Sequence, residues 1–247
     1  MTLWVFGDSF FVDIRHLSAS NESRRLYTKN PPFFDLEKNW TNLVADALGC
    51  EDYVDEAVAG CSNEYIYHRL MSRRHEFKNE DYVITGLTAF DRRWLVERCP
   101  HLANWSYCRF DPNAPNSVTK SENKAIQEYA RHLYSETASV AISDAIFWAM
   151  VHLAKEYESI GVKFLILPAF NFVPGVVGTL NEVSTKEFDS DKTLNDFYKK
   201  TNDSRWNHFS EENHRILANK VVRFFTNFET VDLTTDFKTS IYTKNNI

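Results

Sequence analysis

The sequence has few of the features that mark disulfide-rich, metal-binding or nucleic-acid-binding proteins. None of its four cysteines forms a C-x-x-C pair, so zinc-binding and thioredoxin-like sites are not indicated. Buried free thiols in a reducing compartment are the simpler interpretation. There is no long Lys/Arg run and the net charge is −6, which argues against binding to nucleic acid or to an anionic membrane surface.

Long apolar segments are missing as well. The first apolar run, Leu3–Phe6, is too short for the core of a signal peptide, and no basic leader precedes it. No stretch reaches the ~18 consecutive apolar residues of a membrane-spanning helix. We therefore expect a soluble cytoplasmic chain that starts at Met1, has no signal peptide and has neither a membrane nor a nucleic acid as a partner.

What the sequence does contain is typical of a single globular domain. Its 247 residues are enough to bury a substantial core, and we expect one domain over residues 1–247. Aromatic residues make up 15% of the chain, so the core or a binding surface is expected to be rich in rings.

Short apolar runs alternate with amphipathic stretches along the chain. The apolar runs predict five strands, at residues 3–6, 53–58, 82–85, 162–167 and 230–233. Apolar residues at helical spacing predict helices at 40–49, 62–77, 139–161 and 210–225, capped in the second case by Ser62 or Asn63 and in the fourth by Ser210. This alternation indicates an α/β protein with a parallel sheet, and ligands bind such sheets beyond the carboxyl ends of their strands.

Three segments lack regular periodicity. Residues 95–123 contain three prolines and are expected to form an inserted loop region that serves as a lid or a substrate wall. Residues 175–202 are expected to be loop-like or mixed. The polar tail after Asp236 is expected to be loose.

Three of the seven glycines, Gly7, Gly60 and Gly86, end the first three predicted strands. Glycine is common at strand ends because it tolerates positive φ, so ordinary turns are one interpretation. The other interpretation is that three strand ends converge on one site and bring their backbones close to a ligand.

The first of these turns carries a hydroxyl, and a histidine lies just before a capped helix near the other end of the chain. Ser9 is the candidate nucleophile, His208 the candidate base, and Asp203 the candidate partner that orients the imidazole. A neutral serine hydroxyl is a weak nucleophile until a base removes its proton, so this combination suits a serine hydrolase.

Four ordered blocks of sequence resemble those of the SGNH, or GDSL-type, hydrolases. FGDSF (6–10) is similar to the first block, AGCSN (59–63) to the second and NHFSEENHRILA (207–218) to the last, while ITGLTAFDR (84–92) lies where the third is expected. The resemblance implies a flavodoxin-like three-layer α/β/α sandwich around a five-stranded parallel sheet. It also implies that Ser9 is the nucleophile, that His208 is the base, and that the N–H groups of Ser9 and Gly60 form the oxyanion hole.

Two positions depart from the family pattern. Where the third block usually has an asparagine the chain has Thr88, so the oxyanion-hole candidates include the Thr88 hydroxyl and the Asn63 amide. Where the last block usually has an aspartate the chain has Arg205, and Asp203 is the nearest replacement. A Ser–His dyad without an acid and a loss of activity both stay open. The layout also resembles SGNH-like proteins encoded by tailed bacteriophages and their hosts, and a phage-encoded protein of this kind would be virion-associated.

Several residues have a structural and a functional interpretation side by side. Asp8 is assigned to the substrate-binding region, where we expect it to hydrogen-bond neighbouring loop amides, and Trp206 either lines the pocket or packs in the core. Asn63 suits a helix cap as well as an oxyanion donor. His214 lies inside the last predicted helix and is expected to pack there, whereas His208 lies in the loop before that helix.

The leading functional hypothesis is a serine esterase that forms an acyl-enzyme and needs no metal or organic cofactor. Rings such as Trp105, Tyr107 and Trp206 favour O-deacetylation of a glycan, although rings in an insertion equally suit a subunit contact. The alternative is a catalytically silent SGNH-like domain with a structural or receptor-binding role in a larger assembly, such as a homo-oligomer or a phage virion. A flavodoxin-like ligand-binding module is less well supported, because no phosphate-cradling glycine-rich loop is present.

Overall fold

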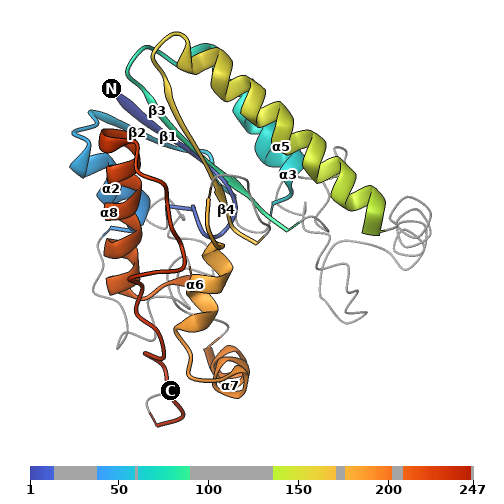
Figure 1. Cartoon of the computed structure of the whole chain (residues 1–247), viewed down its shortest axis with the longest axis vertical. Helices are drawn as coiled ribbons and strands as arrows, with labels where there is room; N and C mark the ends of the chain where they lie inside the picture. Colours follow the sequence, from blue (N-terminus) through green and yellow to red (C-terminus); the bar gives the residue numbers. More distant parts are fainter. Residues whose placement is uncertain (14–37, 59–60, 90–135, 171–175, 202–207, 246–247) are drawn as a thin grey trace, which may run out of the picture.

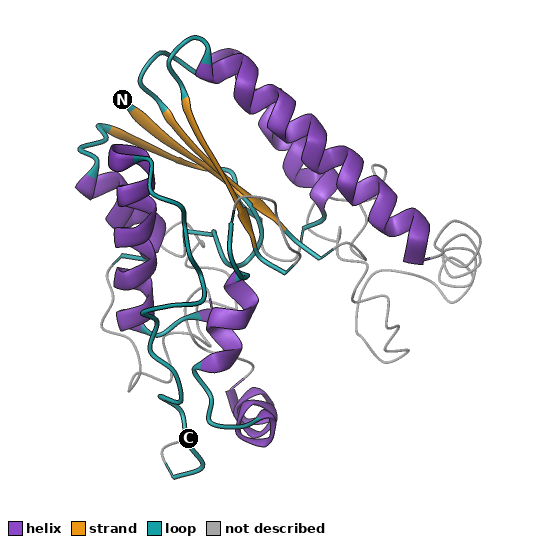
Figure 2. Ribbon diagram, viewed as in Figure 1, coloured by secondary structure: helices purple, strands orange, loops and turns teal. Residues whose placement is uncertain are grey.

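The structure is a computed structural model that describes residues 1–247 except 14–37, 59–60, 90–135, 171–175, 202–207 and 246–247. Its centre is a parallel sheet with the strand order β2–β1–β3–β4, made of β1 (Thr2–Phe6), β2 (Asp52–Asp55), β3 (Tyr82–Leu87) and β4 (Lys163–Pro168). Figure 2 shows these strands between two groups of helices. The predicted class, α/β with a parallel sheet, is confirmed.

Helices cover both faces of the sheet (Figure 1). On one face lie α2 (Trp40–Ala47) and α8 (Glu211–Asn227), and on the other lie α3 (Asn63–Arg73), which continues into the 3-10 turn η2 (Arg74–Glu76), and α5 (Glu136–Glu158). Two further helices, α6 (Leu180–Lys186) and α7 (Asp191–Thr201), follow β4. The arrangement is compatible with a three-layer sandwich. None of the described helices, not even the 23-residue α5, combines the length and apolarity needed to cross a membrane.

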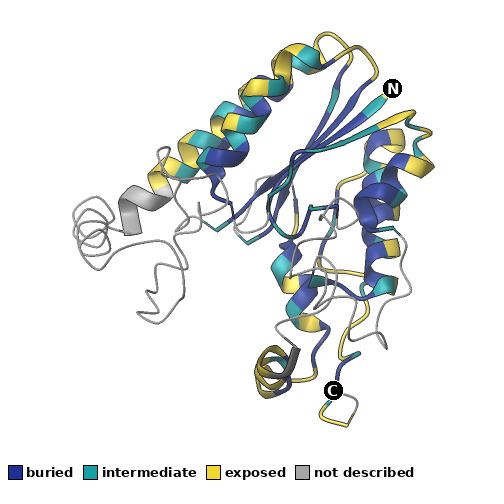
Figure 3. Ribbon diagram, turned by 180° about the vertical axis from the view of Figure 1, so that it is seen from behind, coloured by how far each residue is buried: buried dark blue, intermediate teal, exposed yellow. Residues whose placement is uncertain are grey.

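The central strand β1 supplies two hydrophobic cores, because successive side chains of a strand point to opposite faces. Leu3 and Val5 belong to the core under α2 and α8, whereas Trp4 and Phe6 belong to the core under α3 and α5. All four side chains are buried, and Figure 3 shows most of the sheet in the colour of buried residues. The carboxyl end of β1 is thereby fixed from both faces of the sheet.

Most predicted elements are present, with shifted ends. Ser62 caps α3 and Ser210 caps α8, since each side chain accepts a hydrogen bond from the backbone N–H three residues further on. β2 is shorter than the predicted strand at 53–58, although the N–H groups of Glu56 and Val58 still donate to carbonyls of the β1 segment.

The fifth predicted strand, at residues 230–233, does not extend the sheet. Asp232 instead forms an isolated parallel bridge with Val177, beyond the end of β4. Val231 and Leu233 are each 1% exposed, so the apolar residues that indicated a strand are buried as part of an irregular segment. Within the described residues the sheet thus has four strands, not five.

Residues 176–201 and the described part of the C-terminal tail are more ordered than expected for residues 175–202 and the tail. The first of these segments contains α6 and α7, and α6 begins with a capping box in which Thr179 and Glu182 bond reciprocally. The expectation of a loose tail does not hold as far as Tyr242, which forms a parallel bridge with Phe188 and packs its ring against Phe188 and Phe197. A buried aromatic residue in the tail is the physical reason.

The strand order creates a topological switch between β1 and β3. β2 lies on one side of this pair and β4 on the other, so the connections that follow β1 and β3 diverge. In open parallel sheets, ligands bind in the crevice at such a point. Ser9 follows β1 and Thr88 follows β3, which places both residues at the switch.

Candidate active site

Ser9 lies in a tight turn directly after β1. The backbone N–H of Phe11 donates to the Asp8 carbonyl (2.9 Å), and the N–H of Phe10 donates to the Asp8 carboxylate (3.1 Å). Asp8 is fully buried, whereas Ser9 is partly exposed. The turn therefore presents the Ser9 hydroxyl at the carboxyl edge of the sheet, while Asp8 ties the loop amides together from within.

A phenylalanine ring fills the space beside two of the strand-end glycines. A Cβ atom on Gly7 would lie 2.4 Å from the Phe11 ring, and a Cβ atom on Gly86 would lie 2.2 Å from it. Phe11 is fully buried and also packs edge-on against Trp40. The absence of a Cβ atom at these two glycines thus makes room for a core ring.

Beneath Ser9, buried hydrogen bonds join the ends of β1 and β3 to the start of α3. The Thr88 hydroxyl donates to the Asp8 carboxylate (2.7 Å), and the Thr88 N–H donates to the side-chain oxygen of Asn63 (2.8 Å). The Asn63 amide nitrogen donates to the Thr88 carbonyl (3.2 Å) and to the Ser143 hydroxyl of α5 (3.3 Å). Asp8, Thr88 and Asn63 are at most 1% exposed.

These contacts bear on three of the predicted roles. A hydroxyl has one proton to donate, so Thr88 can serve an oxyanion only if its bond to Asp8 breaks. The Asn63 amide already has two acceptors within the protein, which gives it a structural task at the start of α3. Asp8 has no exposed surface, so the assignment to substrate contact is corrected: it holds the loop, as the amide contacts indicate.

The candidate base meets the candidate nucleophile from a distant part of the chain. His208 Nε2 lies 2.8 Å from Ser9 Oγ, a hydrogen-bond distance, although 199 positions separate the two residues. The His208 ring also packs against the Phe10 ring, with the centroids 4.7 Å apart, which restricts its rotation. Both partners are partly exposed. An imidazole nitrogen is thus placed where a proton leaving Ser9 would go.

His208 has a left-handed backbone, with φ 64°. For a residue with a Cβ atom this conformation costs roughly 1–2 kcal/mol, and strain of this kind clusters at functional sites. The following residue, Phe209, is fully buried and packs its ring against Phe10. The imidazole is therefore aimed by a sharp backbone turn just before α8.

His214, the competing histidine, lies in the core. It is fully buried in α8, and its Nδ1 accepts a hydrogen bond from the backbone N–H of Trp40 (3.2 Å) at the start of α2. The first N–H groups of a helix need partners of this kind from outside the helix. His214 thus joins two helices, as expected of a packing residue, and His208 is the histidine beside Ser9.

Several predicted site features lie outside the described residues. They are the oxyanion donor Gly60, the acid Asp203, the pocket residue Trp206 and the inserted region 95–123. Their roles stay predictions.

Sequence reasoning missed Glu187, a fully buried residue that follows α6. Its carboxylate accepts hydrogen bonds from the N–H and the hydroxyl of Ser210, the cap of α8. No local pattern indicated this role, because 23 positions separate the two residues and the intervening segment was expected to be loop-like or mixed. Ser143 was missed for the same reason, since it reaches Asn63 from 80 positions away.

A second polar region lies at the carboxyl end of β2. Asp55 accepts hydrogen bonds from the N–H groups of Ala57 (2.9 Å) and Asp13 (2.6 Å). Burial raises the pKa of Asp55 to about 7; the two backbone bonds oppose the shift and the Asp13 carboxylate adds to it. The segment after the nucleophile turn is thus tied to β2 through a carboxyl group that titrates near neutral pH.

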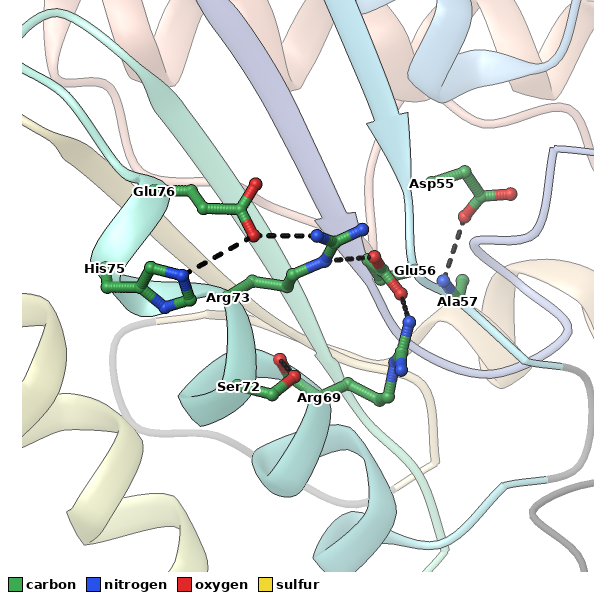
Figure 4. A network of polar contacts seen from close by, with 8 residues as sticks. All are labelled: Asp55, Glu56, Ala57, Arg69, Ser72, Arg73, His75 and Glu76. Carbon is green, nitrogen blue, oxygen red and sulfur yellow. Dashed lines mark hydrogen bonds and ion pairs between the residues drawn. The ribbon is translucent and has the colours of Figure 1, made fainter.

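Figure 4 shows a neighbouring ion-pair network around Glu56. The buried Glu56 carboxylate pairs with Arg69 and with Arg73 (2.6 Å), and Arg73 also pairs with Glu76 (2.7 Å). His75 also lies near Glu76 (3.9 Å), so two carboxylates face two guanidinium groups and an imidazole in this network. The network fixes α3, the helix that begins with Asn63, to the end of β2.

No protein-family model matches the chain, and no curated protein gives a significant match. Within the part of the chain that the structure describes, no group of three or more His, Cys, Asp or Glu side chains is placed to hold a metal ion.

Proposed function

We propose that the protein is a serine hydrolase of the SGNH type that cleaves an ester through an acyl-enzyme, with Ser9 as nucleophile and His208 as general base. The observation that supports this most is the 2.8 Å separation between Ser9 Oγ and His208 Nε2. The position of the Ser9–His208 pair at the switch point of a parallel sheet adds support, because ligands bind at such points in open α/β folds.

The proposed reaction needs only a neutral imidazole and a water molecule. His208 Nε2 takes the Ser9 proton as the serine oxygen attacks the ester carbonyl, and the imidazolium then protonates the departing alcohol. Water, deprotonated by the same imidazole, attacks the acyl group on Ser9 and releases the carboxylic acid. The restrained His208 ring suits both proton transfers, because the same nitrogen faces the reacting oxygen each time.

The oxyanion hole in this proposal is built mainly from backbone N–H groups, those of Ser9 and Gly60, as the family resemblance implies. Side chains contribute less, because the Thr88 hydroxyl is bonded to Asp8 and the Asn63 amide to Thr88 and Ser143. Asp203 is the proposed partner of His208 Nδ1.

The proposed substrate is an acylated small molecule or glycan, and O-deacetylation of a glycan is the first reaction to assay. The aromatic residues that favour a sugar lie outside the described residues, so this preference is supported by the sequence alone. Acetylated oligosaccharides and short-chain aryl acetates form a suitable first panel, because they separate a general esterase from one that needs a sugar.

A fluorophosphonate probe tests the proposed nucleophile directly, because it reacts with a serine that a base has activated. Mass spectrometry of the labelled, folded protein should find the adduct on Ser9, and Ser9→Ala should remove it. Ser143→Ala is the matched control, since it deletes a hydroxyl bonded to Asn63 and should leave the label in place. Absence of label in folded wild-type protein would contradict the proposal.

A catalytically silent domain is the second candidate, and the engaged side chains of Thr88 and Asn63 favour it. Such a domain would keep the fold and bind a glycan or a partner without turnover. The same experiment separates the two candidates, because a silent domain shows neither a Ser9 adduct nor acetate release from any member of the panel.

A further inference from the structure

One buried carboxylate holds the start of α8, immediately after the candidate base. Both oxygens of Glu187 accept the Ser210 N–H, at 2.8 and 3.1 Å, and one of them also accepts the Ser210 hydroxyl (2.7 Å) and the Asn213 side-chain amide (2.6 Å). Glu187 is fully buried, and a negative charge at a helix N-terminus is favourable. Ser210 lies two residues after His208, so this anchor fixes the chain close to the imidazole.

The C-terminal segment completes the hold. Asn213 accepts a hydrogen bond from the Lys238 N–H (2.8 Å) and donates one to the Lys238 carbonyl (3.0 Å). The Tyr242 N–H donates to the Glu187 carbonyl (2.8 Å), and the Tyr242 ring stacks on Phe188 with the centroids 5.0 Å apart. Residues 238–242, the C-terminal clasp, therefore contact the Asn213 side chain and the backbone of Glu187, the two residues that fix the start of α8.

Helix α8 does not need Glu187 or the C-terminal clasp merely to begin at this point. Ser210 already caps α8, because its hydroxyl accepts a hydrogen bond from the Asn213 N–H. Glu187 and the clasp add a fixed starting point for the left-handed backbone at His208. A displacement of about 1 Å at a reacting group can cost 10²-fold in rate, so a fixed starting point matters for proton transfer.

We propose that Glu187 is a positioning residue for His208, and that the C-terminal clasp acts through Asn213 and Glu187 to keep the imidazole within hydrogen-bond distance of Ser9. This inference rests on the proposed function of that pair. Loosening the clasp lengthens the Nε2–Oγ separation and slows attack by Ser9. It leaves the substrate surface in place, so kcat falls while KM changes little.

Glu187→Gln tests the proposal, because it keeps the size of the side chain but removes the charge and places an amide where Ser210 needs an acceptor. Glu182→Gln is the matched control: it changes a carboxylate in the neighbouring helix α6 that accepts the Thr179 N–H and caps that helix. In folded samples, Ser9 of Glu187→Gln should react with the fluorophosphonate at least tenfold more slowly than wild type. Glu182→Gln should stay within about twofold, since ordinary surface capping does not reach the site.

A second readout does not depend on reactivity. Ser9→Ala should change the ring ¹⁵N resonances of His208, because it removes the contact with Nε2. The same substitution should change them far less in the Glu187→Gln background, where the imidazole has moved away, and as much as in wild type in the Glu182→Gln background. This double-mutant cycle measures the Ser9–His208 contact itself. A general loss of stability would not remove the effect of Ser9→Ala on the His208 resonances, so the cycle separates loss of the contact from loss of stability.

The outcomes are distinct. A folded Glu187→Gln protein that reacts at the wild-type rate and shows the full Ser9→Ala change overturns the positioning role. Wild-type protein without a Ser9 adduct overturns the proposed function, and the resonance cycle then decides the positioning role alone. If Glu187→Gln does not fold, Asn213→Ser is the variant to test. One serine hydroxyl cannot reach Glu187 and also bond both the N–H and the carbonyl of Lys238, so labelling of Ser9 should slow several-fold. An unchanged labelling rate would refute the role of the clasp.

Discussion

The two sides of the candidate site are held in different ways. The nucleophile side is part of the sheet: Ser9 sits on a turn whose amides bond to Asp8 and whose Phe11 ring lies against Gly7 and Gly86, at the ends of β1 and β3. The base side is more peripheral: His208 itself has a left-handed backbone, and Glu187, which holds the start of α8, adjoins a small separate cluster around Tyr242.

This difference separates the effects that mutations should have. A change on the nucleophile side disturbs fully buried groups of the main core and should lower the free energy of unfolding. A change on the base side disturbs a partly exposed ring and its anchors and should lower the rate first. Measuring both quantities for each variant tests whether the two sides are independent.

The largest effect is expected from His208→Ala, with His214→Ala as its counterpart. Loss of a general base should slow Ser9 labelling by about 10²–10⁴, with little change in stability because the ring is partly exposed. His214→Ala should do the reverse, costing about 1–3 kcal/mol of stability because the Trp40 N–H loses its acceptor. Labelling kinetics and urea denaturation measure the two; equal rate losses would contradict the assignment of the base.

Asp55 should make the nucleophile side sensitive to pH. Its pKa is raised from 3.8 to about 7 in the folded protein, so its contribution to stability is fully present below about pH 4 and is lost as the pH rises through about 7. This difference corresponds to at most about 4 kcal/mol. Urea denaturation at several pH values should show a decline toward pH 8 that is flatter in Asp55→Asn; an unchanged slope would exclude Asp55 as its source.

Gly86→Ala tests the close fit between the Phe11 ring and Gly86. The new methyl group would overlap the ring, so we expect a loss of about 1–3 kcal/mol. Phe11→Leu makes room for the methyl, and the double variant should therefore lose less than the sum of the two single losses. Strict additivity in chemical denaturation would mean that the ring and the glycine are not coupled.

The smallest effect is expected at Thr88. Thr88→Val removes the hydroxyl that Asp8 accepts and should cost about 1–2 kcal/mol, while Thr88→Ser keeps the hydrogen bond and should cost less. Loss of a true oxyanion donor slows a reaction by about 10²–10³, and we expect a far smaller change per folded molecule. If Thr88→Val slowed the reaction by about 10²–10³ and Thr88→Ser restored the rate, Thr88 would be an oxyanion donor after all.

The features that could be predicted from the sequence are those encoded locally. An apolar run followed by Gly-Asp-Ser indicates a strand and its turn, and a serine cap after His208 separates that residue from His214, which is inside the helix. The capping box at Thr179 and Glu182 also has a local sequence pattern, a threonine followed three residues later by a glutamate, although the sequence analysis does not predict α6.

The features that could not be predicted depend on partners far apart in the chain. Phe11 explains Gly86 only once β1 and β3 are known to be neighbours. Glu187 gains its role only when α6 meets the start of α8. The apolar residues at 231 and 233 alternate as they would in a strand, and only the packing shows that they fill the core from an irregular segment.

The left-handed backbone at position 208 limits which amino acids this position can tolerate. Histidine, asparagine and aspartate are enriched severalfold among non-glycine residues in this conformation, whereas β-branched residues are strongly disfavoured there. A saturation library at this position should therefore lose Val, Ile and Thr even in a screen that is blind to activity. Asn and Gly should survive such a screen, and Asn offers the replacement that deletes the imidazole while disturbing the loop least.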